Sequence, residues 1–196
     1  TQPGGRGRYD EANDLVTETQ GSLVRSAGAY VKLLAESSDT QQLIDTARRL
    51  MRTRKNSPEA LAGLDKALAA EPDRAHAHLY KAMWLLEAGR DGEADTHLAQ
   101  AESLRGGRHL LALRAVSRGD HALAVEHLTQ LLAMEVEQVQ LLQTGAFAAD
   151  TQPRLLLAIA LEKRGRGDAS RRVLKELLAA DPALIEAWLL LDDREK

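Results

Sequence analysis

One short segment recurs four times along this chain, and that recurrence strongly limits the folds open to it. Each copy is a turn followed by a small residue, an apolar residue four positions later, and an apolar or small residue three positions after that. This spacing puts the three residues on one face of an α-helix. The small and apolar pairs are Ala60 and Leu64, Ala94 and Leu98, Ala124 and Leu128, and Ser170 and Leu174. The sequence therefore predicts four related helices, each with one buried stripe.

Helix-start signals precede these four helices. Ser57 comes directly before Pro58, which is an N-cap followed by proline at the first helical position. Asp91, Asp120 and Asp168 are candidate N-caps for the other three. Each turn also follows a helical pattern, over residues 41–52, 75–88, 108–117 and 154–163. The unit is therefore a helix, a turn and a second helix, with a repeat of roughly 30–34 residues.

The helix expected over residues 75–88 shows the clearest apolar face among the first helices. Leu79, Ala82, Met83 and Leu86 fall at positions i, i+3, i+4 and i+7. Trp84 follows Met83 on the side of this helix that faces the core. We therefore expect Trp84 to be largely buried between helices.

Composition agrees with an all-α globular chain. Of the 196 residues, 44% are hydrophobic and 28% charged, and Leu and Ala, which favour helices, dominate the apolar part. The net charge of −3 argues against a nucleic-acid-binding protein. The absence of cysteine excludes disulfides, thiol catalysis and thiolate metal sites. No apolar run reaches the roughly 18 residues of a membrane span, and no signal peptide is visible.

The same signals divide the chain into segments. An insertion interrupts the array between the third and fourth repeats. Val136, Val139 and Leu142 suggest a short extra helix at its start, and Thr144–Gly145 and residues 150–153 after it are expected to be loops. The expected segments are a linker at 1–9, N-terminal helices at 10–39, repeats at about 40–72, 73–104, 105–134 and 151–184, the insertion at 135–150, a capping helix at 185–191 and a tail at 192–196.

These features resemble the tetratricopeptide repeat family over roughly residues 40–191. The family places a Trp, a Leu-Gly pair and a Tyr on the first helix, and an Ala, a Phe and a closing Pro around the second. Trp188 matches the Trp site, and Pro72 and Pro182 match the closing Pro. The small sites of the first helices hold Ala82, Ala112 and Ala158. The sites where the family has large aromatic residues hold Leu64, Leu98, Leu128 and Leu174.

The resemblance implies an α-solenoid of antiparallel helix pairs, wound as a right-handed superhelix, in which stacked pairs bury a continuous core. It also implies that the first helices line a concave face where most family members bind peptides or protein segments. We therefore expect a scaffold or assembly-factor domain that binds a segment of a partner protein. Threading the family pattern predicts these partner-binding residues: Asp45, Arg49, Arg52, Leu79, Met83, Leu86, His109, Leu113, Val116, Leu155 and Ile159.

The apolar members of this set predict a groove for an amphipathic or hydrophobic segment, and the basic end at Arg49 and Arg52 would set its orientation. The set lacks the Lys and Asn with which tetratricopeptide co-chaperones hold the acidic tails of heat-shock chaperones, so we do not expect such a tail as the partner. Alternatively, the segment 135–153 or the helices at 10–35 fold back and fill the groove.

Catalysis and metal binding find little support. His76 and His78 are two residues apart, and His121 and His127 are six apart, so neither pair shares a helix face well. No strand-turn-helix elbow presents a serine nucleophile, and residues 4–7 lack the context of a phosphate loop. We expect no enzyme activity, no cofactor and no metal, solvated or capping histidines, and neither nucleic acid nor direct membrane insertion.

Two other functions stay open at this point. The chain begins at Thr1 rather than Met, so it is expected to be a processed or partial chain, and it could be the regulatory or targeting module of an enzyme whose catalytic domain lies upstream. It could also associate with itself through its end helices. The sequence predicts a soluble protein of the cytoplasm or periplasm, and it does not identify the partner or the oligomeric state.

Overall fold

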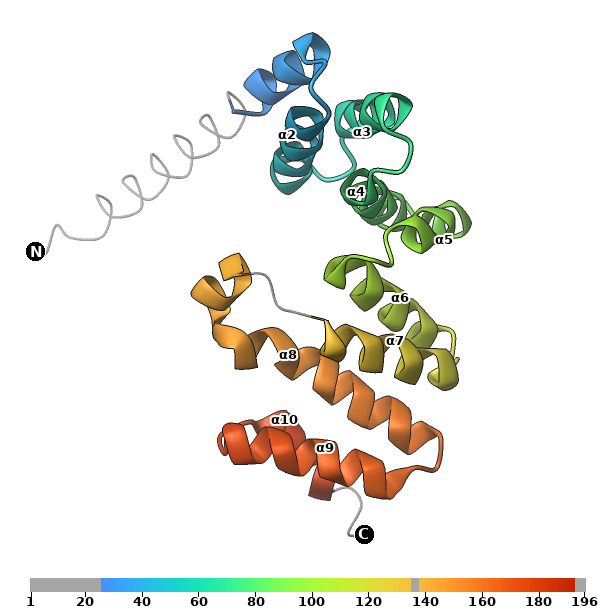
Figure 1. The fold of residues 1–196 in the computed structure, drawn as a ribbon, viewed down its shortest axis with the longest axis vertical. Helices are drawn as coiled ribbons and strands as arrows, with labels where there is room; N and C mark the ends of the chain where they lie inside the picture. Colours follow the sequence, from blue (N-terminus) through green and yellow to red (C-terminus); the bar gives the residue numbers. More distant parts are fainter. Residues whose placement is uncertain (1–25, 135–137, 193–196) are drawn as a thin grey trace, which may run out of the picture. The chain divides into compact units, whose positions relative to one another are not determined.

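The computed structural model describes residues 26–134 and 138–192, and within these ranges it is all-α (Figure 1). The expected linker at 1–9, the expected helical residues before 26, Val136 and the tail after Asp192 lie outside the described residues. The first described helix spans residues 26–36. It is followed by α2 (Thr40–Thr53), α3 (Pro58–Ala70), α4 (Ala75–Glu87), α5 (Asp91–Gln100), α6 (Arg105–Ser117), α7 (His121–Ala133), α8 (Gln138–Lys163), α9 (Gly167–Ala180) and α10 (Ile185–Asp192).

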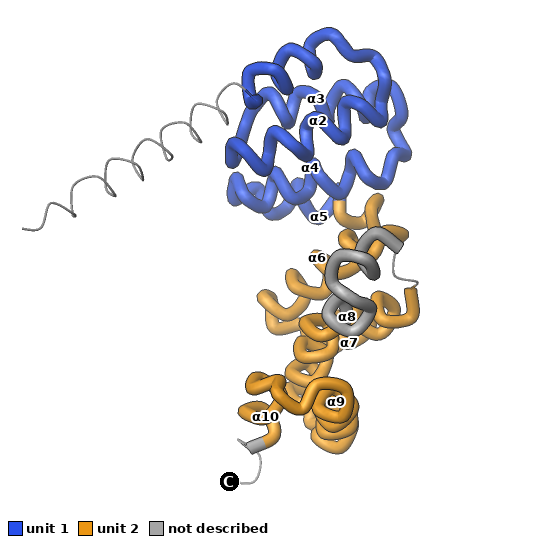
Figure 2. Tube along the Cα trace, turned by 90° about the vertical axis from the view of Figure 1, so that its left-hand side faces the viewer, with its two compact units in different colours: residues 1–97 blue, residues 98–196 orange. Residues whose placement is uncertain are grey.

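The helices pack as sequential antiparallel pairs in two compact units (Figure 2). Unit 1 comprises residues 1–97 and unit 2 residues 98–196. In unit 1, α3 packs against α2 and α4, and α2 and α4 also touch. In unit 2, each helix from α6 to α10 packs against the next one along the chain, and α10 also contacts α8. The predicted all-α architecture of paired helices is confirmed.

One turn geometry joins the first and second helices of three successive repeats. Gly89, Gly119 and Gly165 occupy equivalent places and have φ angles of 72°, 75° and 70°. After Gly89, the backbone N–H of Arg90 donates to the carbonyl of Leu85 at 2.8 Å, and the same bond follows the other two glycines. This is a helix C-terminus closed by a left-handed residue, which glycine adopts without steric cost. The repeat therefore extends to the backbone of its turns.

Two of the predicted N-caps are confirmed. The Ser57 side chain accepts a hydrogen bond from the backbone N–H of Ala60 at 3.3 Å, and Pro58 is the first residue of α3. The Asp120 carboxylate accepts from the backbone N–H of Leu123 at 3.0 Å. Each cap satisfies a donor that the first helical turn leaves unpaired.

The other two aspartates lie inside their helices, so their assignment as caps is wrong. Asp91 is the first residue of α5. Helix α9 begins at Gly167, which places Asp168 in its first turn, where its carboxylate pairs with Arg171 at 2.8 Å. An acid in the first turn still interacts favourably with the helix dipole, so the sequence signal marked the helix start within one or two residues.

The helix pairs approach closely because small residues occupy their contact positions. Each unit has an apolar core along its contacting helices. Small residues with no exposed surface lie on first helices at Ala47, Ala82, Ala112 and Ala158, and on second helices at Ala60, Ala94, Ala124 and Ser170. The hydroxyl of Ser170 is satisfied because it donates to the carbonyl of Ala158 at 2.6 Å.

Helix α8 corrects one prediction. It runs from Gln138 to Lys163, so the loops expected at 144–145 and 150–153 are wrong. Residues 138–150 of the insertion and the fourth first helix form one element. Pro153 is buried inside it, although proline removes one helical hydrogen bond. Packing of the helix against α7 and α9 outweighs this local cost, since propensity is a weak signal beside tertiary contacts. No helix in the described ranges, α8 included, has the length and apolarity that crossing a membrane requires.

Candidate functional site

Unit 1 contains a cavity of about 430 Å³ between the helix at 26–36 and α2. Two of the predicted partner-binding residues, Asp45 and Arg49, line it. The helix at 26–36 contributes an apolar wall and α2 contributes a polar one. The lining residues are Tyr30, Leu33, Asp39, Gln41, Gln42, Asp45, Thr46 and Arg49.

Hydrogen bonds fix the start of the polar wall. Asp39 is the N-cap of α2, and its carboxylate accepts from the backbone N–H of Gln42 at 2.6 Å. The Ser37 hydroxyl accepts from the backbone N–H of Asp39 at 3.1 Å and donates to the side-chain carbonyl of Gln42 at 2.6 Å. The connection between the two helices is therefore held by its own polar side chains, which sets where α2 begins.

Further along α2, the carboxylate of Asp45 is already engaged. The side-chain amide of Gln41 donates to it at 3.0 Å, and the Arg48 guanidinium lies 3.5 Å away. Gln41 in turn accepts from the guanidinium of Arg74 at 2.6 Å, which ties the wall to the start of α4. These contacts orient Asp45 and partly compensate its charge.

Arg49 differs from its neighbours on this wall. It is exposed and makes no ion pair with another described residue. Arg52, three residues further along α2, is also exposed and unpaired within the described part of the chain, but it does not line the cavity. The cavity therefore combines the apolar side chains of Tyr30 and Leu33 with the cation of Arg49 and the carboxylates of Asp39 and Asp45, which already make contacts of their own. Such a site suits a group that has an apolar body and a nearby anion.

The predicted residues on α4 are less open. Leu79 is 8% exposed, and Met83 and Leu86 are half-buried against the core of unit 1. Their side chains hold α4 in the unit and leave part of the surface of Met83 and Leu86 accessible.

The predicted residues of unit 2 lie on two helices. His109, Leu113 and Val116 follow one another along α6, and Leu155 and Ile159 lie on α8. All five are half-buried. Burial lowers the pKa of His109 and so favours its neutral imidazole. The structure thus groups the predicted residues by unit and by helix, and a groove that joins them stays a prediction.

Tyr30 and Leu33 were missed as site residues by the sequence reasoning. Tyr30 lies in an apolar stripe with Ala27, Val31 and Leu34, and this spacing indicates a core residue rather than a site residue. Leu33 lies outside that stripe and is 41% exposed. An apolar residue beside, rather than within, a helical stripe is the signal that could have found it.

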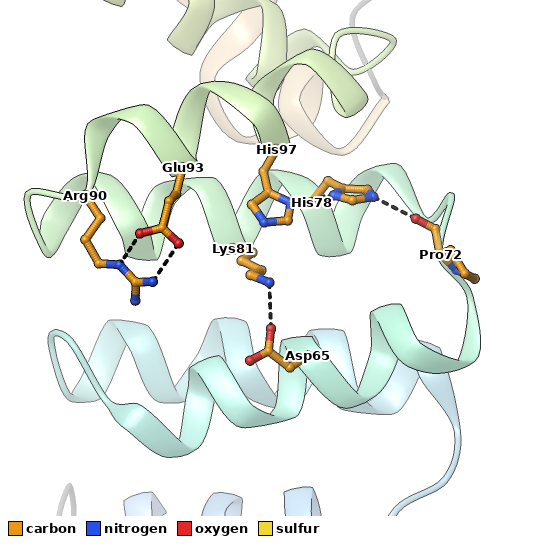
Figure 3. Close-up of polar contacts among 7 residues, drawn as sticks. All are labelled: Asp65, Pro72, His78, Lys81, Arg90, Glu93 and His97. Atoms are coloured by element: carbon orange, nitrogen blue, oxygen red, sulfur yellow. Dashed lines mark hydrogen bonds and ion pairs between the residues drawn. The ribbon is translucent and has the colours of Figure 1, made fainter.

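A histidine pair forms a second polar cluster in unit 1 (Figure 3). The Nδ1 atoms of His78 and His97 are 2.7 Å apart, and Nε2 of His78 is 2.7 Å from the carbonyl oxygen of Pro72. Because a carbonyl only accepts, Nε2 of His78 is the donor in the bond to Pro72. The pair links α4 to α5 and to the turn before α4. The expectation of solvated or capping histidines is wrong for His78, which is 9% exposed.

The charges around His97 oppose a proton on it. Partial burial lowers the pKa of His97, and the ammonium of Lys81 lowers it further. Asp65 and Glu93 act in the opposite direction, but Asp65 pairs with Lys81 at 2.7 Å and Glu93 pairs with Arg90 at 2.6 Å. In the described part of the chain, no three His, Cys, Asp or Glu side chains are grouped to hold a metal ion.

This lowered pKa predicts that unit 1 loses stability in mild acid. Below about pH 6.5, the unfolded chain binds a proton at His97 more readily than the folded chain does. The contribution of neutral His97 to the stability of the folded chain is therefore present above about pH 6.5, and it is lost as the pH falls through the folded-state pKa of His97. Urea midpoints at pH 7.5 and pH 5 should differ less for His97→Gln than for the wild type. The exposed His76→Gln variant should keep the wild-type difference, and an equal reduction in both variants would contradict the prediction.

The arrangement of helices is similar to that of two proteins of known structure. No protein-family model and no curated protein matches the chain by sequence. Among solved structures, the chain is similar to YrrB, "a TPR protein with an unusual peptide-binding site", with a TM-score of 0.66 and 20% identity over 84% of this chain and 80% of that one. It is also similar to the MamA protein, with a TM-score of 0.61 and 19% identity over 83% and 84% of the two chains. The repeated helix pairs therefore have the tetratricopeptide-repeat fold.

Proposed function

We propose that this chain is a protein-interaction module that binds a peptide segment of a partner protein, with the cavity of unit 1 as one binding subsite. The observation that carries the proposal is the uncompensated Arg49 beside the apolar wall of Tyr30 and Leu33. The fold supports it, because tetratricopeptide-repeat proteins generally bind proteins or peptides and are typically non-catalytic. The peptide-binding site named for YrrB gives a precedent on the same fold.

The chemistry of the cavity suggests the kind of peptide. An apolar side chain would bury its surface against Tyr30 and Leu33, which is the favourable term of such contacts. A neighbouring Glu or Asp would receive charge-assisted hydrogen bonds from Arg49. The carboxylate of Asp39 would repel an acidic residue of the peptide at the end of the cavity where Asp39 lies. The half-buried Met83 and Leu86 of α4, in the same unit, would add apolar contacts for a longer segment.

Selection from a random peptide library displayed on phage, against the full chain, tests this proposal. Peptides recovered should carry an acidic residue close to Leu, Ile, Met or Phe. Leu33→Glu should weaken a recovered peptide at least about tenfold, since it places an acid in the apolar wall. Arg49→Ala should weaken it about two- to tenfold, which is the range of a partly exposed ion pair. Affinities would be measured by calorimetry.

Lys55→Ala is the matched control for Arg49→Ala. Lys55 is exposed, does not line the cavity, and makes no ion pair with another described residue. Its removal changes the net charge equally, so it should leave the affinity unchanged apart from long-range attraction, which 0.5 M salt would screen. Equal binding by the wild type, Leu33→Glu and Arg49→Ala would place peptide recognition elsewhere on the chain.

A further inference from the structure

Unit 2 carries a dense group of basic residues at the turn between α8 and α9 and along α9 (Figure 1). All of them are exposed, and none makes an ion pair or a side-chain hydrogen bond with another described residue. These residues, which we call the basic patch, are Lys163, Arg164, Arg166, Arg172 and Lys175. Unpaired charges of one sign on a folded surface attract a partner of the opposite sign.

The acids of the same segment leave the basic patch without a counter-charge. Asp168 pairs with Arg171 at 2.8 Å, and Glu176 pairs with Arg154 at 3.6 Å. Glu162, the one other acid between residues 160 and 180, is half-buried. Neither ion pair includes a residue of the patch, so the patch presents its cations to solvent.

The basic patch belongs to one repeat only. When the repeats are aligned on their turn glycines, the same positions hold one base and one acid in the repeat around Gly89, and one base and two acids in the repeat around Gly119. The first set is Glu87, Ala88, Arg90, Thr96 and Ala99, and the second is Ser117, Arg118, Asp120, Glu126 and Thr129. The architecture of the helix pair therefore does not require cations at these positions.

The arginine that follows the turn glycine shows the difference directly. The guanidinium of Arg90 makes two hydrogen bonds to the carboxylate of Glu93, at 2.7 and 2.6 Å. Arg166 occupies the same place in the last repeat, but Ala169 stands at the position of Glu93, so Arg166 lacks this partner. The dipole of α8 favours the two cations at its C-terminal end, whereas the N-terminus of α9 disfavours Arg166. Local helix electrostatics thus do not account for Arg166.

The face of α9 that carries the patch stays open when another repeat follows. The residues equivalent to its two cations on α5 and α7 are Thr96, Ala99, Glu126 and Thr129. All four are exposed, although further helices come after α5 and after α7. The residues that α9 uses for packing lie on its opposite side: Ser170, Leu174, Leu177 and Leu178. Further repeats of the same chain would therefore leave the patch accessible.

We propose that the basic patch binds an acidic segment of a partner protein, a run of at least about five Glu or Asp residues in an extended conformation. From Arg166 to Lys175 the patch spans roughly 14 Å, at a rise of about 1.5 Å per residue. This length equals about four residues of extended chain at about 3.3 Å each. Side chains of an extended run alternate between two sides, so about half of its carboxylates face the patch at once. The surface includes no cavity residue of unit 1 and does not depend on peptide binding there.

Two other anionic partners fit the patch less well. Proteins hold single-stranded nucleic acid with aromatic side chains on which bases stack, and residues 154–180 contain no Phe, Tyr or Trp. Binding at an anionic membrane surface combines cations with exposed apolar side chains. The exposed large apolar residues of the described chain all lie outside residues 154–180. An acidic protein segment needs only the cations.

A fluorescein-labelled peptide of eight glutamates is the probe, and fluorescence anisotropy follows its binding to the full chain. We expect saturable binding in about 50 mM NaCl that weakens at least about tenfold in about 300 mM NaCl, because salt screens exposed charges. The double variant Arg172→Gln/Lys175→Gln should weaken binding about three- to tenfold, which is the range for two exposed ion pairs. Glutamine favours a helix as these residues do, so the variant should stay folded, and circular dichroism checks this.

Arg52→Gln/Lys55→Gln is the matched control, because both cations belong to unit 1, are exposed and have no ion pair with a described residue. It changes the net charge equally and should bind the peptide within about twofold of the wild type. A peptide of eight glutamines should not bind. Arg49→Ala should bind the acidic peptide as the control does, so that failure of the cavity proposal and failure of this one are distinguishable.

Three results would overturn the proposal. The first is the absence of saturable binding up to about 1 mM peptide. The second is equal weakening by the two double variants, because the overall charge of the chain would then explain the attraction. The third is tighter binding of a labelled uridine dodecamer than of the acidic peptide, lost in Arg172→Gln/Lys175→Gln, which would assign the basic patch to nucleic acid.

Discussion

Replacing Trp84 with Ala should lower the free energy of unfolding by about 3–5 kcal/mol, as large-to-small changes in a core do. Trp84 is 8% exposed and belongs to the core cluster of unit 1, as the amphipathic pattern of its helix predicted. Total stabilities of about 5–15 kcal/mol are usual, so the variant should show a large drop of its urea midpoint and could be unfolded at 37 °C.

The indole of Trp84 also makes a hydrogen bond, so a second variant can separate the contribution of packing from that of hydrogen bonding. Its Nε1–H donates to the backbone carbonyl of Ser57 at 2.9 Å, and the side chain of Ser57 caps α3. Trp84 therefore fixes α4 against the start of α3. Trp84→Phe keeps much of the packing and removes this bond, while the carbonyl of Ser57 still accepts from the backbone N–H of Leu61 at 3.3 Å, so we expect a smaller loss of about 0.5–1.5 kcal/mol.

Trp188→Ala is the matched control, because the same indole is removed from an exposed position. It should change the stability by less than about 1 kcal/mol. Urea denaturation followed by far-ultraviolet circular dichroism measures all three variants without relying on tryptophan emission. Equal losses for Trp84→Ala and Trp188→Ala would show that burial does not set the contribution of Trp84.

Features that depend on neighbours within one helix or turn were predictable from the sequence. Ser57 and Asp120 cap their helices because a side-chain acceptor needs to reach only two or three residues along the chain. Gly89 marks a turn because few other residues adopt its positive φ. The burial of Trp84 followed from a single apolar periodicity.

Features that depend on which helices meet were not predictable. The His78–His97 bond joins residues on two helices, and nothing in the spacing of histidines along one helix indicates it. The cavity likewise needs the helix at 26–36 to face α2, so Leu33 was missed. Helix α8 continues through residues whose local signals indicate loops, because local propensity is outweighed by packing on both neighbouring helices.

The start of α6 was also not predictable from local signals, and it leads to a second prediction with a large expected effect on stability. The helix was expected over residues 108–117, and the two glycines at 106 and 107 are residues that disfavour a helix. The structure starts it at Arg105 and explains why Gly107 is there: a Cβ on this residue would overlap the backbone carbonyl of Ala101. Close approach of the backbone, rather than a turn, requires this glycine.

Gly107→Ala should therefore destabilise unit 2 by about 3 kcal/mol, at the upper end of the overpacking range, because a backbone group cannot rotate away as a side chain can. Gly63→Ala offers the graded comparison. There the added methyl meets only the end of the Leu34 side chain, at 2.5 Å, which can move, so we expect a loss of about 1 kcal/mol.

Gly92→Ala is the third member of the series, because nothing lies within 4 Å of its added methyl. It should leave the stability unchanged or raise it by up to about 1 kcal/mol, since alanine favours a helix and restricts the unfolded chain. Urea midpoints should thus fall in the order Gly92→Ala, Gly63→Ala, Gly107→Ala. If Gly107→Ala were as stable as Gly92→Ala, the connection at Ala101 could shift at little cost, and the start of α6 would not be fixed by this contact.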